Sequence, residues 1–462
     1  MFKPSLWTGK KAGVLGLGKS GRAVATLLCS HGIPVLISEE VALPQARQYT
    51  FPGGIEVETG GHSPALFDCA FWVKSPGISP RAPILLEAKK RRIPVYSELE
   101  VALAFMPSSV RVFAVTGTNG KTTTTTLLGE ILKADAKAHG DKRKVWVCGN
   151  IGNPVSLCVH QMQPGDDVVI EVSSYQLEDS TYFRPKYACL LNITPDHLEH
   201  HGGMRNYIKA KGKIFKNQRT NDVLVVNGAD VSCVELAEKA KSRVLAFATY
   251  PKHLLQTAVF FDGDELVFSD GPQLRPPHLK GIHNVENSMS AALMALQAGV
   301  PAETVQQAFD EFKAMEHRIE QFANHRGVIY VNDSKATNLD STITALKSFD
   351  KCQNIWLILG GRDKGASYEV LLPYLKDYCK QVLTIGEAMD KIERELPGYP
   401  VTRCYTLDKA VNVAMDGAKS GDVVLLSPAC ASFDQFKSYE ERGKVFKRLV
   451  DARIFKERTA KK

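Results

Sequence analysis

The sequence has no long hydrophobic run and no paired cysteines. Its apolar runs, such as VVIEV and ACLLNI, are far shorter than the roughly 18–20 residues that a membrane-crossing helix needs, which argues against membrane insertion. The first residues, MFKPSLWTGKK, carry charge but no apolar stretch follows them, so we expect no signal peptide. The ten cysteines stand singly, without a CxxC pair. We therefore expect buried thiols and a reducing, cytoplasmic location.

A strong charge imbalance is also absent. The 462 residues include 58 Lys and Arg against 50 Asp and Glu, for a net charge of +8. Basic residues are dispersed, and no basic patch is interleaved with aromatic residues, so nucleic acid is a poor candidate partner. With 44% hydrophobic and 23% charged residues, the composition argues against a disordered, collagen-like or coiled-coil chain. The surplus of positive charge then favours small anionic ligands.

Three blocks of alternating strand and helix patterns predict an α/β protein with parallel sheets. The first block has the apolar runs AGVLGLG, PVLISE, DCAFWVKS and IPVYSE, with a helix at 22–31. In the second block, RVFAVTG precedes a helix at 122–132 and a polar stretch, 133–144, that we expect to be an exposed loop. The runs VWVCG, DVVIEV, ACLLNI, VLVVNG and RVLAFA follow, then a hairpin, AVFFDGDELVFS, with DG at its turn, and a helix at 286–297.

The third block contains GVIYVND, NIWLILGG, QVLTIG and DVVLLSP, which are continuous apolar runs. Such runs are typical of parallel strands that are buried on both faces. Ligands of these sheets bind beyond the carboxyl ends of the strands. The polar segments NDSKATN, GGRDKG and SPACASFDQF lie at those ends, so we expect binding residues there.

The clearest local signal is TGTNGKTT (116–123), which follows an apolar strand and opens a helix. Backbone N–H groups would hold anionic oxygens, Lys121 would reach the β- and γ-phosphates, and the Thr122 hydroxyl would bind Mg²⁺. The strict phosphate-loop pattern has Gly where this chain has Val115, so the loop is a variant, and a Gly-rich turn without a ligand is the alternative. Glu171 ends the strand DVVIEV, where a carboxylate either meets the metal or is solvated.

The segment NITPDHLEHH (192–201) allows three interpretations. Thr194 looks like an N-cap with Pro195 at the first helical position, which places His197 in the first turn. A zinc site would combine His197 with His200 or His201, but no partner Cys/His pair occurs elsewhere in the sequence. We favour a single histidine beside an anionic metal–phosphate site over zinc, and a plain surface helix start is the third interpretation.

In YIKAKGKIF (207–215), helical spacing places Lys211 on the same stripe as Tyr207, Ile214 and Phe215. An inward lysine needs a partner or a special role, although a stem that reaches back to solvent is the alternative. We expect the other lysines of this segment to be ordinary solvated charges, namely Lys209, Lys213 and Lys216.

Near the N-terminus, Gly16, Gly18 and Gly21 match a dinucleotide-binding pattern, and Glu39 ends the next strand as a ribose-binding acid would. Such glycines occur in dehydrogenases, in binding sites for other pyrophosphate groups, and in tight strand–helix turns that bind no ligand. Since no other motif indicates hydride chemistry, we favour a nucleotide-like anionic ligand.

Several segments occur in an order that identifies a family: TGTNGKTT, GNIGNP (149–154), EVSSYQLE (171–178), NITPDHLEHH, YIKAKGKIF, GIHNVEN (281–287) and EHRIE (316–320). The chain resembles the Mur ligases, which are ATP-dependent amide ligases, from end to end. Three further segments resemble the family members that add D-glutamate: SPGI (75–78), NDSKATN (332–338) and SPACASFDQFKSYEERG (427–443). An L-alanine-adding Mur ligase or a folate-type glutamate ligase fits these last segments less well.

The resemblance implies three domains: a Rossmann-like UDP-sugar domain (1–105), a central P-loop ATPase-like domain with a parallel sheet (106–314) and a Rossmann-like amino-acid-binding domain (315–462). It implies that ATP phosphorylates the carboxylate of UDP-N-acetylmuramoyl-L-alanine, and that the amine of D-glutamate attacks this acyl phosphate in peptidoglycan precursor synthesis. Positioning and charge neutralisation suffice for this chemistry. The implied cofactor besides ATP is Mg²⁺, with Mn²⁺ as a substitute, and we expect a monomer that acts on these small molecules.

The resemblance also assigns residues by position. Lys121, Glu171, His197 and Lys211 would be catalytic, with Lys211 carbamylated by CO₂, and Thr122, Glu171, His197 and Lys211 would serve the metals. ATP would be bound by Gly117, Thr118, Asn119, Gly120, Lys121, Thr122, Thr123, Asn284, Asn287, Arg318 and Asp333. The UDP-sugar substrate would contact Gly18, Lys19, Ser20, Ser38, Ser75, Pro76, Gly77, Asn150, Ser173 and Gln176. D-Glutamate would contact Lys335, Thr337, Lys364, Ser432, Phe433 and Tyr439.

The uridine pocket departs from the family pattern. The family often has Leu-Thr where this chain has Lys19-Ser20, and Thr-Arg where it has Ser38-Glu39. A carboxylate near a UDP group is unfavourable, so the role of Glu39 stays open.

Overall fold

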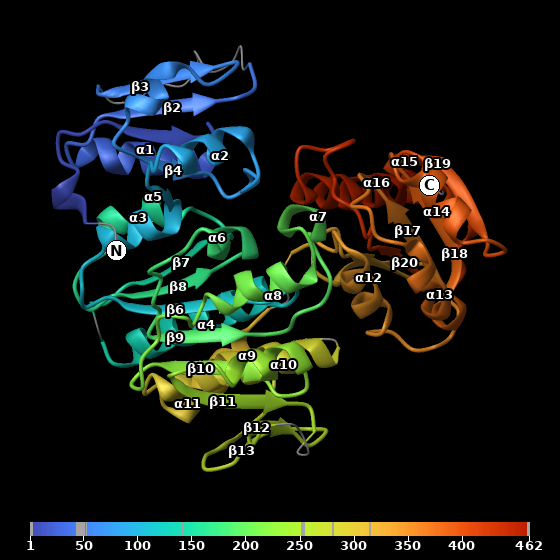
Figure 1. The fold of residues 1–462 in the computed structure, drawn as a ribbon. Coiled ribbons are helices and arrows are strands. Elements are labelled where there is room, and N and C mark those ends of the chain that lie inside the picture. Colours follow the sequence, from blue (N-terminus) through green and yellow to red (C-terminus); the bar gives the residue numbers. More distant parts are fainter. Residues whose placement is uncertain are drawn as a thin grey trace. The chain divides into compact units, whose positions relative to one another are not determined.

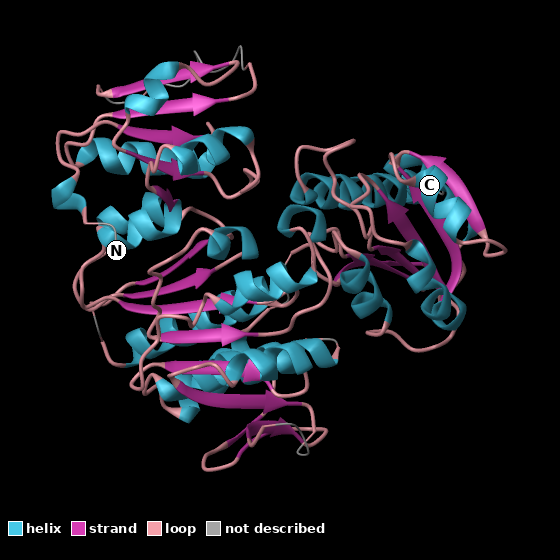
Figure 2. Cartoon of the chain, viewed as in Figure 1, coloured by secondary structure: helices cyan, strands magenta, loops and turns pink. Residues whose placement is uncertain are grey.

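The computed structural model describes residues 3–42, 51, 53–140, 142–250, 255–279, 281–313 and 316–459. The chain forms two compact units, Met1–Pro276 with Glu286–Glu311, and Pro277–Val285 with Phe312–Lys462. The described residues contain three sheets with their helices, two sheets in the first unit and one in the second (Figure 1, Figure 2). The predicted α/β fold class is confirmed. The three domain boundaries stay a prediction, and Met315, where the third was placed, lies outside the described residues.

The first sheet has five parallel strands in the order β3-β2-β1-β4-β5. They are β1 (Ala12–Leu15), β2 (Val35–Glu39), β3 (Ile55–Thr59), β4 (Phe71–Lys74) and β5 (Val95–Ser97). The helices are α1 (Lys19–Ser30), α2 (Pro83–Lys90) and α3 (Glu98–Ala104), with 3₁₀ helices η1 (Pro4–Leu6) and η3 (Pro64–Asp68). Four of these strands match predicted runs. The fifth, β3, is an edge strand whose alternating sequence IEVET contains no continuous apolar run.

The second sheet has nine strands in the order β14-β13-β12-β11-β10-β9-β6-β8-β7. They are β6 (Arg111–Thr116), β7 (Val145–Gly149), β8 (Asp167–Glu171), β9 (Tyr187–Leu190), β10 (Val223–Asn227), β11 (Arg243–Ala248), β12 (Thr257–Phe261), β13 (Leu266–Phe268) and β14 (Gln273–Leu274). The helices are α4 (Lys121–Ala138), α5 (Val155–Cys158), η4 (Val159–Gln161), α6 (Ser174–Glu178), α7 (Leu198–His201), α8 (Met204–Gly212), α9 (Val231–Ala237), α10 (Ile282–Gln297) and α11 (Ala302–Glu311). Strands β6 to β12 pair in parallel, and β13 and β14 are antiparallel additions.

Helix α4 is longer than predicted. We expected an exposed loop at 133–144, but the helix continues to Ala138. Asp135 and Ala136 are buried, and Asp135 forms an ion pair with Arg143. The expectation of a loop was therefore wrong for the residues up to Ala138, because one face of this polar stretch packs inward.

The predicted hairpin is present as β12 and β13, but its turn has four residues (262–265) instead of two. The Asp262 carboxylate accepts hydrogen bonds from the N–H groups of Asp264 (3.0 Å) and Glu265 (2.8 Å). An aspartate that binds the backbone two and three residues ahead stabilises this longer turn.

The third sheet has six strands in the order β15-β16-β20-β17-β18-β19, and all neighbouring pairs are parallel except β15 with β16. The strands are β15 (Glu320–His325), β16 (Val328–Asn332), β17 (Ile355–Gly360), β18 (Cys379–Ile385), β19 (Val401–Tyr405) and β20 (Val423–Leu426). The helices are α12 (Leu339–Leu346), η5 (Tyr368–Leu371), α13 (Leu372–Tyr378), α14 (Met389–Glu395), α15 (Leu407–Gly417) and α16 (Tyr439–Thr459). The four predicted strands are central, and the two additional ones, β15 and β19, are the edges.

Burial follows the apolar runs. Strands β8, β10 and β20 are buried at every residue, as expected for strands covered on both faces. All ten cysteines are free thiols, and eight of them are buried.

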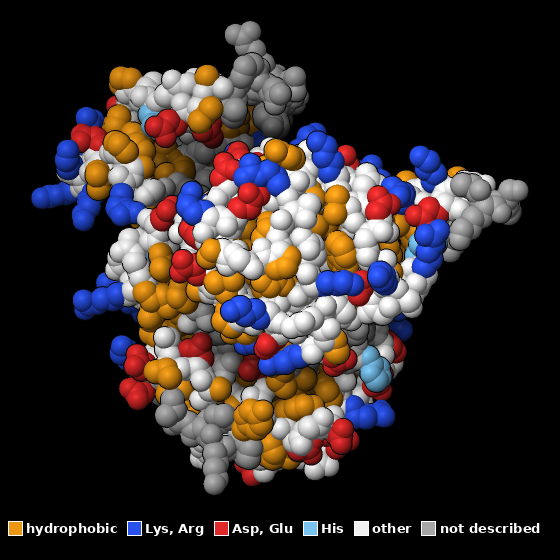
Figure 3. Space-filling view, turned by 90° about the vertical axis from the view of Figure 1, so that its right-hand side faces the viewer, with side chains coloured by type: hydrophobic (Ala, Val, Ile, Leu, Met, Phe, Trp, Pro, Cys, Tyr) orange, Lys and Arg blue, Asp and Glu red, His pale blue; other side chains and the backbone are white. Residues whose placement is uncertain are grey.

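Among the described residues, no helix is long and apolar enough to span a bilayer. On the face shown in Figure 3, Lys and Arg side chains are interspersed with Asp and Glu, in agreement with the dispersed charge of the sequence.

Candidate active site

The predicted phosphate loop connects β6 to α4 at the carboxyl edge of the second sheet. Gly120 precedes the helix with a φ of 84°, and a Cβ at this position would lie 2.2 Å from Asn287 Oδ1. A Cβ at Gly117 would lie 2.9 Å from Leu191 Cβ. Both glycines are therefore required by conformation or by close packing. The strand–loop–helix context that the sequence predicted is confirmed.

Asn192, which follows β9, holds the loop in place. Its Oδ1 accepts a hydrogen bond from Asn119 N–H (2.8 Å), and its backbone O accepts one from Thr118 N–H (3.0 Å). Lys121 Nζ donates to the carbonyls of Gly117 (2.9 Å) and Thr118 (2.7 Å), so the ammonium group lies over the loop. These contacts fix the loop and place a cation where phosphate oxygens would bind.

Glu171 ends β8, the strand next to β6, and its side chain is almost fully buried. Its Oε1 accepts a hydrogen bond from Asn150 Nδ2 (2.8 Å), whereas its buried Oε2 has no partner among the described residues. The hydroxyl of Thr123, in the first turn of α4, is likewise buried and without a partner in the described part of the chain. Buried acceptors without partners are costly, so this edge of the sheet fits a bound cation.

His197 lies just before α7 rather than inside it. Its φ is 54°, in the left-handed region, and it occupies the N-cap position of α7. The prediction that Thr194 caps the helix was wrong. Thr194 N–H and O instead bond the hydroxyl of Thr118 (3.0 Å each), so the segment binds back to the phosphate loop before the helix begins. His197 remains near this loop and lies beside Asp196, with 3.5 Å between Nε2 and Oδ2.

Lys211 on α8 is buried, with 1% of the residue exposed, so the inward orientation is confirmed and the solvent-reaching alternative was wrong. Its Nζ lies 4.7 Å from the centroid of the Tyr207 ring. Burial, reinforced by the nearby positive charge of Lys121 and opposed by Asp196, lowers the pKa of Lys211 well below its ordinary value. Burial therefore favours the neutral form of this amine. The Tyr207 hydroxyl bonds Thr118 Oγ1 (2.9 Å), which joins α8 to the phosphate loop.

The other lysines of this segment differ from one another. Lys209 and Lys216 are exposed, as predicted. Lys213 is not an ordinary solvated charge, because its Nζ donates to the backbone carbonyl of Glu178 and its burial lowers its pKa. Helix α8 ends at Gly212, so Lys213 does not follow the helical spacing used for the prediction.

The candidate UDP-sugar residues lie at the carboxyl ends of β1, β2 and β4. Glu39 Oε2 accepts a hydrogen bond from Leu17 N–H (2.9 Å), so this carboxylate binds the backbone of the glycine-rich loop itself. Ser38 is fully buried, and its hydroxyl donates to Glu58 (2.5 Å) and contacts His62 Nδ1 (2.7 Å). A Cβ at Gly21 would lie 2.0 Å from the carbonyl of Gly16, which explains the third glycine of the pattern by close packing.

The remaining residues of this candidate set lie nearby in the chain or in the second sheet's loops. Lys19 Nζ donates to the carbonyl of Gly152 (2.6 Å). Ser173 and Gln176 form a capping box at the start of α6, which accounts for both residue types by local structure. The others at the first sheet are Gly18, Ser20, Ser75, Pro76 and Gly77.

Two of the predicted ATP-binding residues, Arg318 and Asp333, belong to the second unit. Asp333 follows β16, and its carboxylate accepts hydrogen bonds from Ser427 Oγ (2.7 Å) and Ile319 N–H (3.2 Å). Burial raises the pKa of Asp333 to about 7, against the opposing effects of Ser427 and Arg318. His317 and Ile319, on either side of Arg318, have φ values of 66° and 43°. Left-handed backbone at a β-branched residue is strained, and such strain is common at functional sites.

Arg442 is a residue that sequence reasoning did not single out. It is almost fully buried and donates to Ser334 Oγ (2.9 Å), Ser334 O (2.8 Å) and Cys430 O (3.1 Å). It therefore joins the loops after β16 and β20 to helix α16. Lys335, one of the predicted D-glutamate residues, lies 5.5 Å from the ring of Tyr439 at the start of that helix. The available signal for Arg442 was its position within the segment SYEERG, but an arginine among charged residues is normally expected to be solvated.

The other predicted residues lie in further loops of the third sheet or on α10. Ser432 is buried and Phe433 is exposed. Thr337 precedes α12, and Lys364 follows β17. Asn284 and Asn287 are both buried on α10, and Asn287 Oδ1 accepts a hydrogen bond from Thr124 (3.3 Å) on α4.

The strand–loop–helix element, its glycines and its lysine define the class of P-loop α/β proteins. Family models match three stretches of the chain: the MurD N-terminal domain at 11–84, the Mur ligase middle domain at 115–295, and the Mur ligase, glutamate ligase domain at 317–430. The UDP-N-acetylmuramoylalanine–D-glutamate ligase of Elusimicrobium minutum is 52% identical over 97% of this chain and 99% of its own length. The chain belongs to the Mur ligase family.

Two further comparisons agree. The UDP-N-acetylmuramoylalanine–D-glutamate ligase of Koribacter versatilis is 46% identical over 96% of this chain and 97% of its own length. Among solved structures, UDP-N-acetylmuramate-alanine ligase MurC from Thermotoga maritima matches with a TM-score of 0.61, covering 96% of this chain and 99% of that one. At 20% sequence identity, that match establishes the fold alone.

Proposed function

We propose that this chain is an ATP-dependent ligase that adds D-glutamate to UDP-N-acetylmuramoyl-L-alanine in peptidoglycan precursor synthesis. The terminal carboxylate of the UDP-sugar substrate takes the γ-phosphoryl group of ATP, and the amine of D-glutamate then displaces phosphate to form the amide. The products are the extended UDP-sugar, ADP and phosphate. The observation that carries the proposal is the similarity to D-glutamate ligases over almost the whole length of both chains.

The site at the carboxyl edge of the second sheet fits the phosphoryl-transfer step. Lys121 and the N–H groups at the start of α4 would bind and orient the phosphates. Thr122 would hold one Mg²⁺ ion, for which Mn²⁺ is a substitute, and Glu171 would help to hold a second. The fit rests on the buried Oε2 of Glu171, which has no partner in the described part of the chain and which a divalent ion would satisfy. The metal neutralises charge on the transferring group when bound.

Lys211 would act as a carbamate. Its neutral amine attacks the carbon of CO₂, an N–C bond forms, and one amine proton is released to solvent, which leaves a carboxylate-like anion at the end of the side chain. The fit rests on the burial of this amine beside Lys121, where a second cation is unfavourable and an anion is favourable. His197 would help Glu171 to bind the second metal ion, and the carbamate would orient metal-bound groups.

The remaining assignments follow the family positions. Arg318 would contact the γ-phosphate and Asp333 the ribose of ATP, while Lys335 and the loops after β17 and β20 would receive the two carboxylates of D-glutamate. A monomeric state and a cytoplasmic location stay predictions.

The test is phosphate release with ATP, Mg²⁺ and UDP-N-acetylmuramoyl-L-alanine while the amino acid is varied. D-Glutamate is expected to stimulate release strongly over background, and L-glutamate, L-alanine and glycine are not. Mass spectrometry of the product should show one added glutamate. Equal stimulation by D- and L-glutamate, or preference for another amino acid, would contradict the proposed substrate while leaving the ligase class intact.

A further inference from the structure

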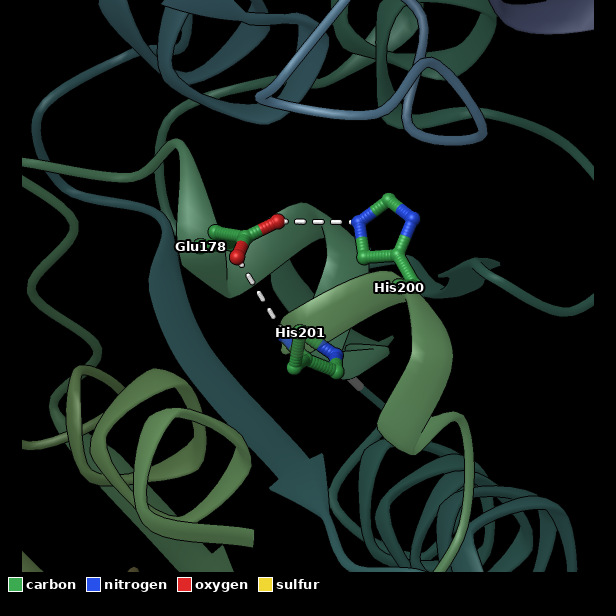
Figure 4. A group of neighbouring side chains, drawn as sticks. All are labelled: Glu178, His200 and His201. Carbon is green, nitrogen blue, oxygen red and sulfur yellow. Dashed lines mark hydrogen bonds and ion pairs between the residues drawn. The ribbon is translucent and has the colours of Figure 1, made fainter. Parts of the chain in front are cut away.

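A group of three metal-ligating side chains lies outside the site described above. Glu178 is the last residue of α6, and His200 and His201 end α7 (Figure 4). His200 Nε2 lies 2.9 Å from Glu178 Oε2, and His201 Nδ1 lies 3.2 Å from Glu178 Oε1. One ligand atom from each residue lies within 4.8 Å of the others. The two imidazoles therefore converge on one carboxylate from a different helix.

We propose that Glu178, His200 and His201 form a binding site for a borderline transition-metal ion, for which Zn²⁺ is the best match. Two imidazole nitrogens and one carboxylate oxygen are a known zinc ligand set, and three protein ligands leave the fourth tetrahedral position for water. With metal–ligand bonds of about 2.0–2.1 Å, tetrahedral ligand atoms are about 3.3 Å apart. The separations of 2.9 and 3.2 Å, each to a different oxygen of Glu178, are shorter than this value by a few tenths of an ångström, and the three ligand atoms all lie within 4.8 Å of one another.

The surroundings supply an outer partner for one of the imidazoles. His201 Nε2 lies 3.0 Å from Ser174 Oγ on α6. With the metal on Nδ1, the proton of this ring resides on Nε2 and is donated to the serine hydroxyl, and such partners orient histidine ligands. The side chain of His201 is fully buried and that of His200 is 12% exposed, so both rings are held in position before an ion arrives.

The protonation states also suit a metal. Burial lowers the pKa of His200 despite the hydrogen bond to Glu178, so its imidazole is neutral near pH 7. The two imidazoles lower the pKa of Glu178 against the effect of burial, so its carboxylate is ionised. The nearby basic groups are Lys74, which is paired with Asp179 (2.7 Å), Lys213, whose pKa is lowered by burial, and Arg81, whose guanidinium donates to the backbone carbonyls of Glu199 and His200 (3.3 Å). An ion here therefore meets one net negative ligand, and the basic groups around it are engaged by Asp179 or by backbone carbonyls.

This site differs from the candidate Mg²⁺ site in donor chemistry. Mg²⁺ prefers oxygen ligands and retains much of its water, whereas imidazole nitrogens favour Zn²⁺ and related ions. The ring of Tyr175 contacts His197, His200 and His201 at centroid distances of 4.9, 4.2 and 5.6 Å. A metal that ties α7 to α6 would thus fix the short helix that directly follows His197. The inference does not depend on the proposed ligase activity.

The experiment measures Zn²⁺ binding to the full-length, metal-free protein in excess Mg²⁺ by competition with a chromophoric chelator. We expect one tight site in the wild-type protein, and at least about tenfold weaker binding in His200→Ala and Glu178→Gln. His160→Ala, which removes an exposed histidine on η4, is the matched control and is expected to bind as the wild type does. Equal affinity in His200→Ala and the wild type would overturn the inference.

Two further variants keep the test decisive if a ligand variant is poorly folded. His200→Cys retains a ligand, so Co²⁺ bound to it should show a sulfur-to-cobalt charge-transfer band that Co²⁺ in the wild type lacks. A missing band in a folded His200→Cys protein would overturn the inference. His197→Ala distinguishes the two candidate sites: loss of tight Zn²⁺ binding in this variant, with binding retained in His200→Ala, would place the ion at the proposed catalytic site instead.

Discussion

Two regions of the first unit differ in whether their buried polar side chains have hydrogen-bond partners. At the phosphate-loop edge, Glu171 Oε2 and the Thr123 hydroxyl are buried without partners in the described part of the chain, and Lys211 is buried beside Lys121. In the group of Glu178, His200 and His201, each carboxylate oxygen contacts one imidazole nitrogen, and the second nitrogen of His201 contacts Ser174. The two regions share the short segment that carries His197 and α7.

This difference in hydrogen bonding indicates that the phosphate-loop edge requires a ligand, whereas a ligand of the Glu178 group is optional. Unmet buried groups cost free energy of about 1–3 kcal/mol each, so a fold that keeps them gains when a ligand meets them. A group whose members satisfy one another is stable without an ion and binds one only by exchanging hydrogen bonds for coordination. We therefore expect substitutions at the phosphate-loop edge to affect turnover, and those around Glu178 to affect stability or metal affinity.

The largest expected effect is that of Lys211→Ala. Loss of the anion that the carbamate would provide should lower turnover by at least about 10²–10³-fold, because a preorganised charge near the transferring group is removed. Short carboxylates such as formate or acetate should restore part of the activity in the space left by the side chain. ¹³C NMR of the wild-type protein under ¹³CO₂ should show a carbamate signal that the variant lacks.

Lys209→Ala, on the exposed face of the same helix, is the control and should turn over as the wild type does. Wild-type turnover in Lys211→Ala, in a protein with an unchanged circular dichroism spectrum, would contradict the carbamate proposal. It would also contradict the expectation that substitutions at the phosphate-loop edge lower turnover.

The sequence was sufficient to predict the central parallel strands, the phosphate loop and the inward lysine. These depend on local patterns: continuous apolar runs, glycines before a helix, and a lysine at helical spacing from Tyr207. It did not predict β3, β15 or β19, because these three edge strands have no continuous apolar run. It also misplaced the start of α7, because the bonds of Thr194 to Thr118 join segments far apart in the chain.

The same limit applies to the Glu178 group. The sequence analysis did not favour a zinc site of His197 with His200 or His201, because no partner Cys/His pair occurs in the sequence. The side chain that His200 and His201 contact in the structure is Glu178, at the end of another helix. Arg442 was missed for a similar reason: its three backbone and hydroxyl acceptors come from two loops that only the fold brings together. Long-range pairing of polar groups leaves no periodic signal along the chain.

Asp333 in the second unit is a buried carboxylate with hydrogen-bond partners, so by the comparison above its substitution should change stability. Its folded pKa of about 7 lies above the unfolded value of about 3.9, so the folded protein binds an additional proton between these pH values. Stability from this group is therefore present below about pH 4 and is lost as pH rises through about 7, with a slope of up to about 1.4 kcal/mol per pH unit.

Asp333→Asn should remove that slope, because the amide can bond Ser427 and Ile319 without titrating. Urea unfolding of the wild type and the variant at a series of pH values gives the difference directly. Parallel stability curves between pH 4 and 8 would show that Asp333 is ionised in the folded protein throughout this range.

The smallest expected effect concerns Lys213, which lies on the Glu178 side of the comparison. Its Nζ donates to the Glu178 carbonyl, so Lys213→Ala should lower the free energy of unfolding by about 1 kcal/mol, whereas Lys209→Ala, at an exposed position, should stay within about 0.5 kcal/mol of the wild type. Thermal unfolding of both variants in parallel, without added metal, measures the contrast. Equal unfolding temperatures would mean that this bond is replaced by water at no cost in free energy.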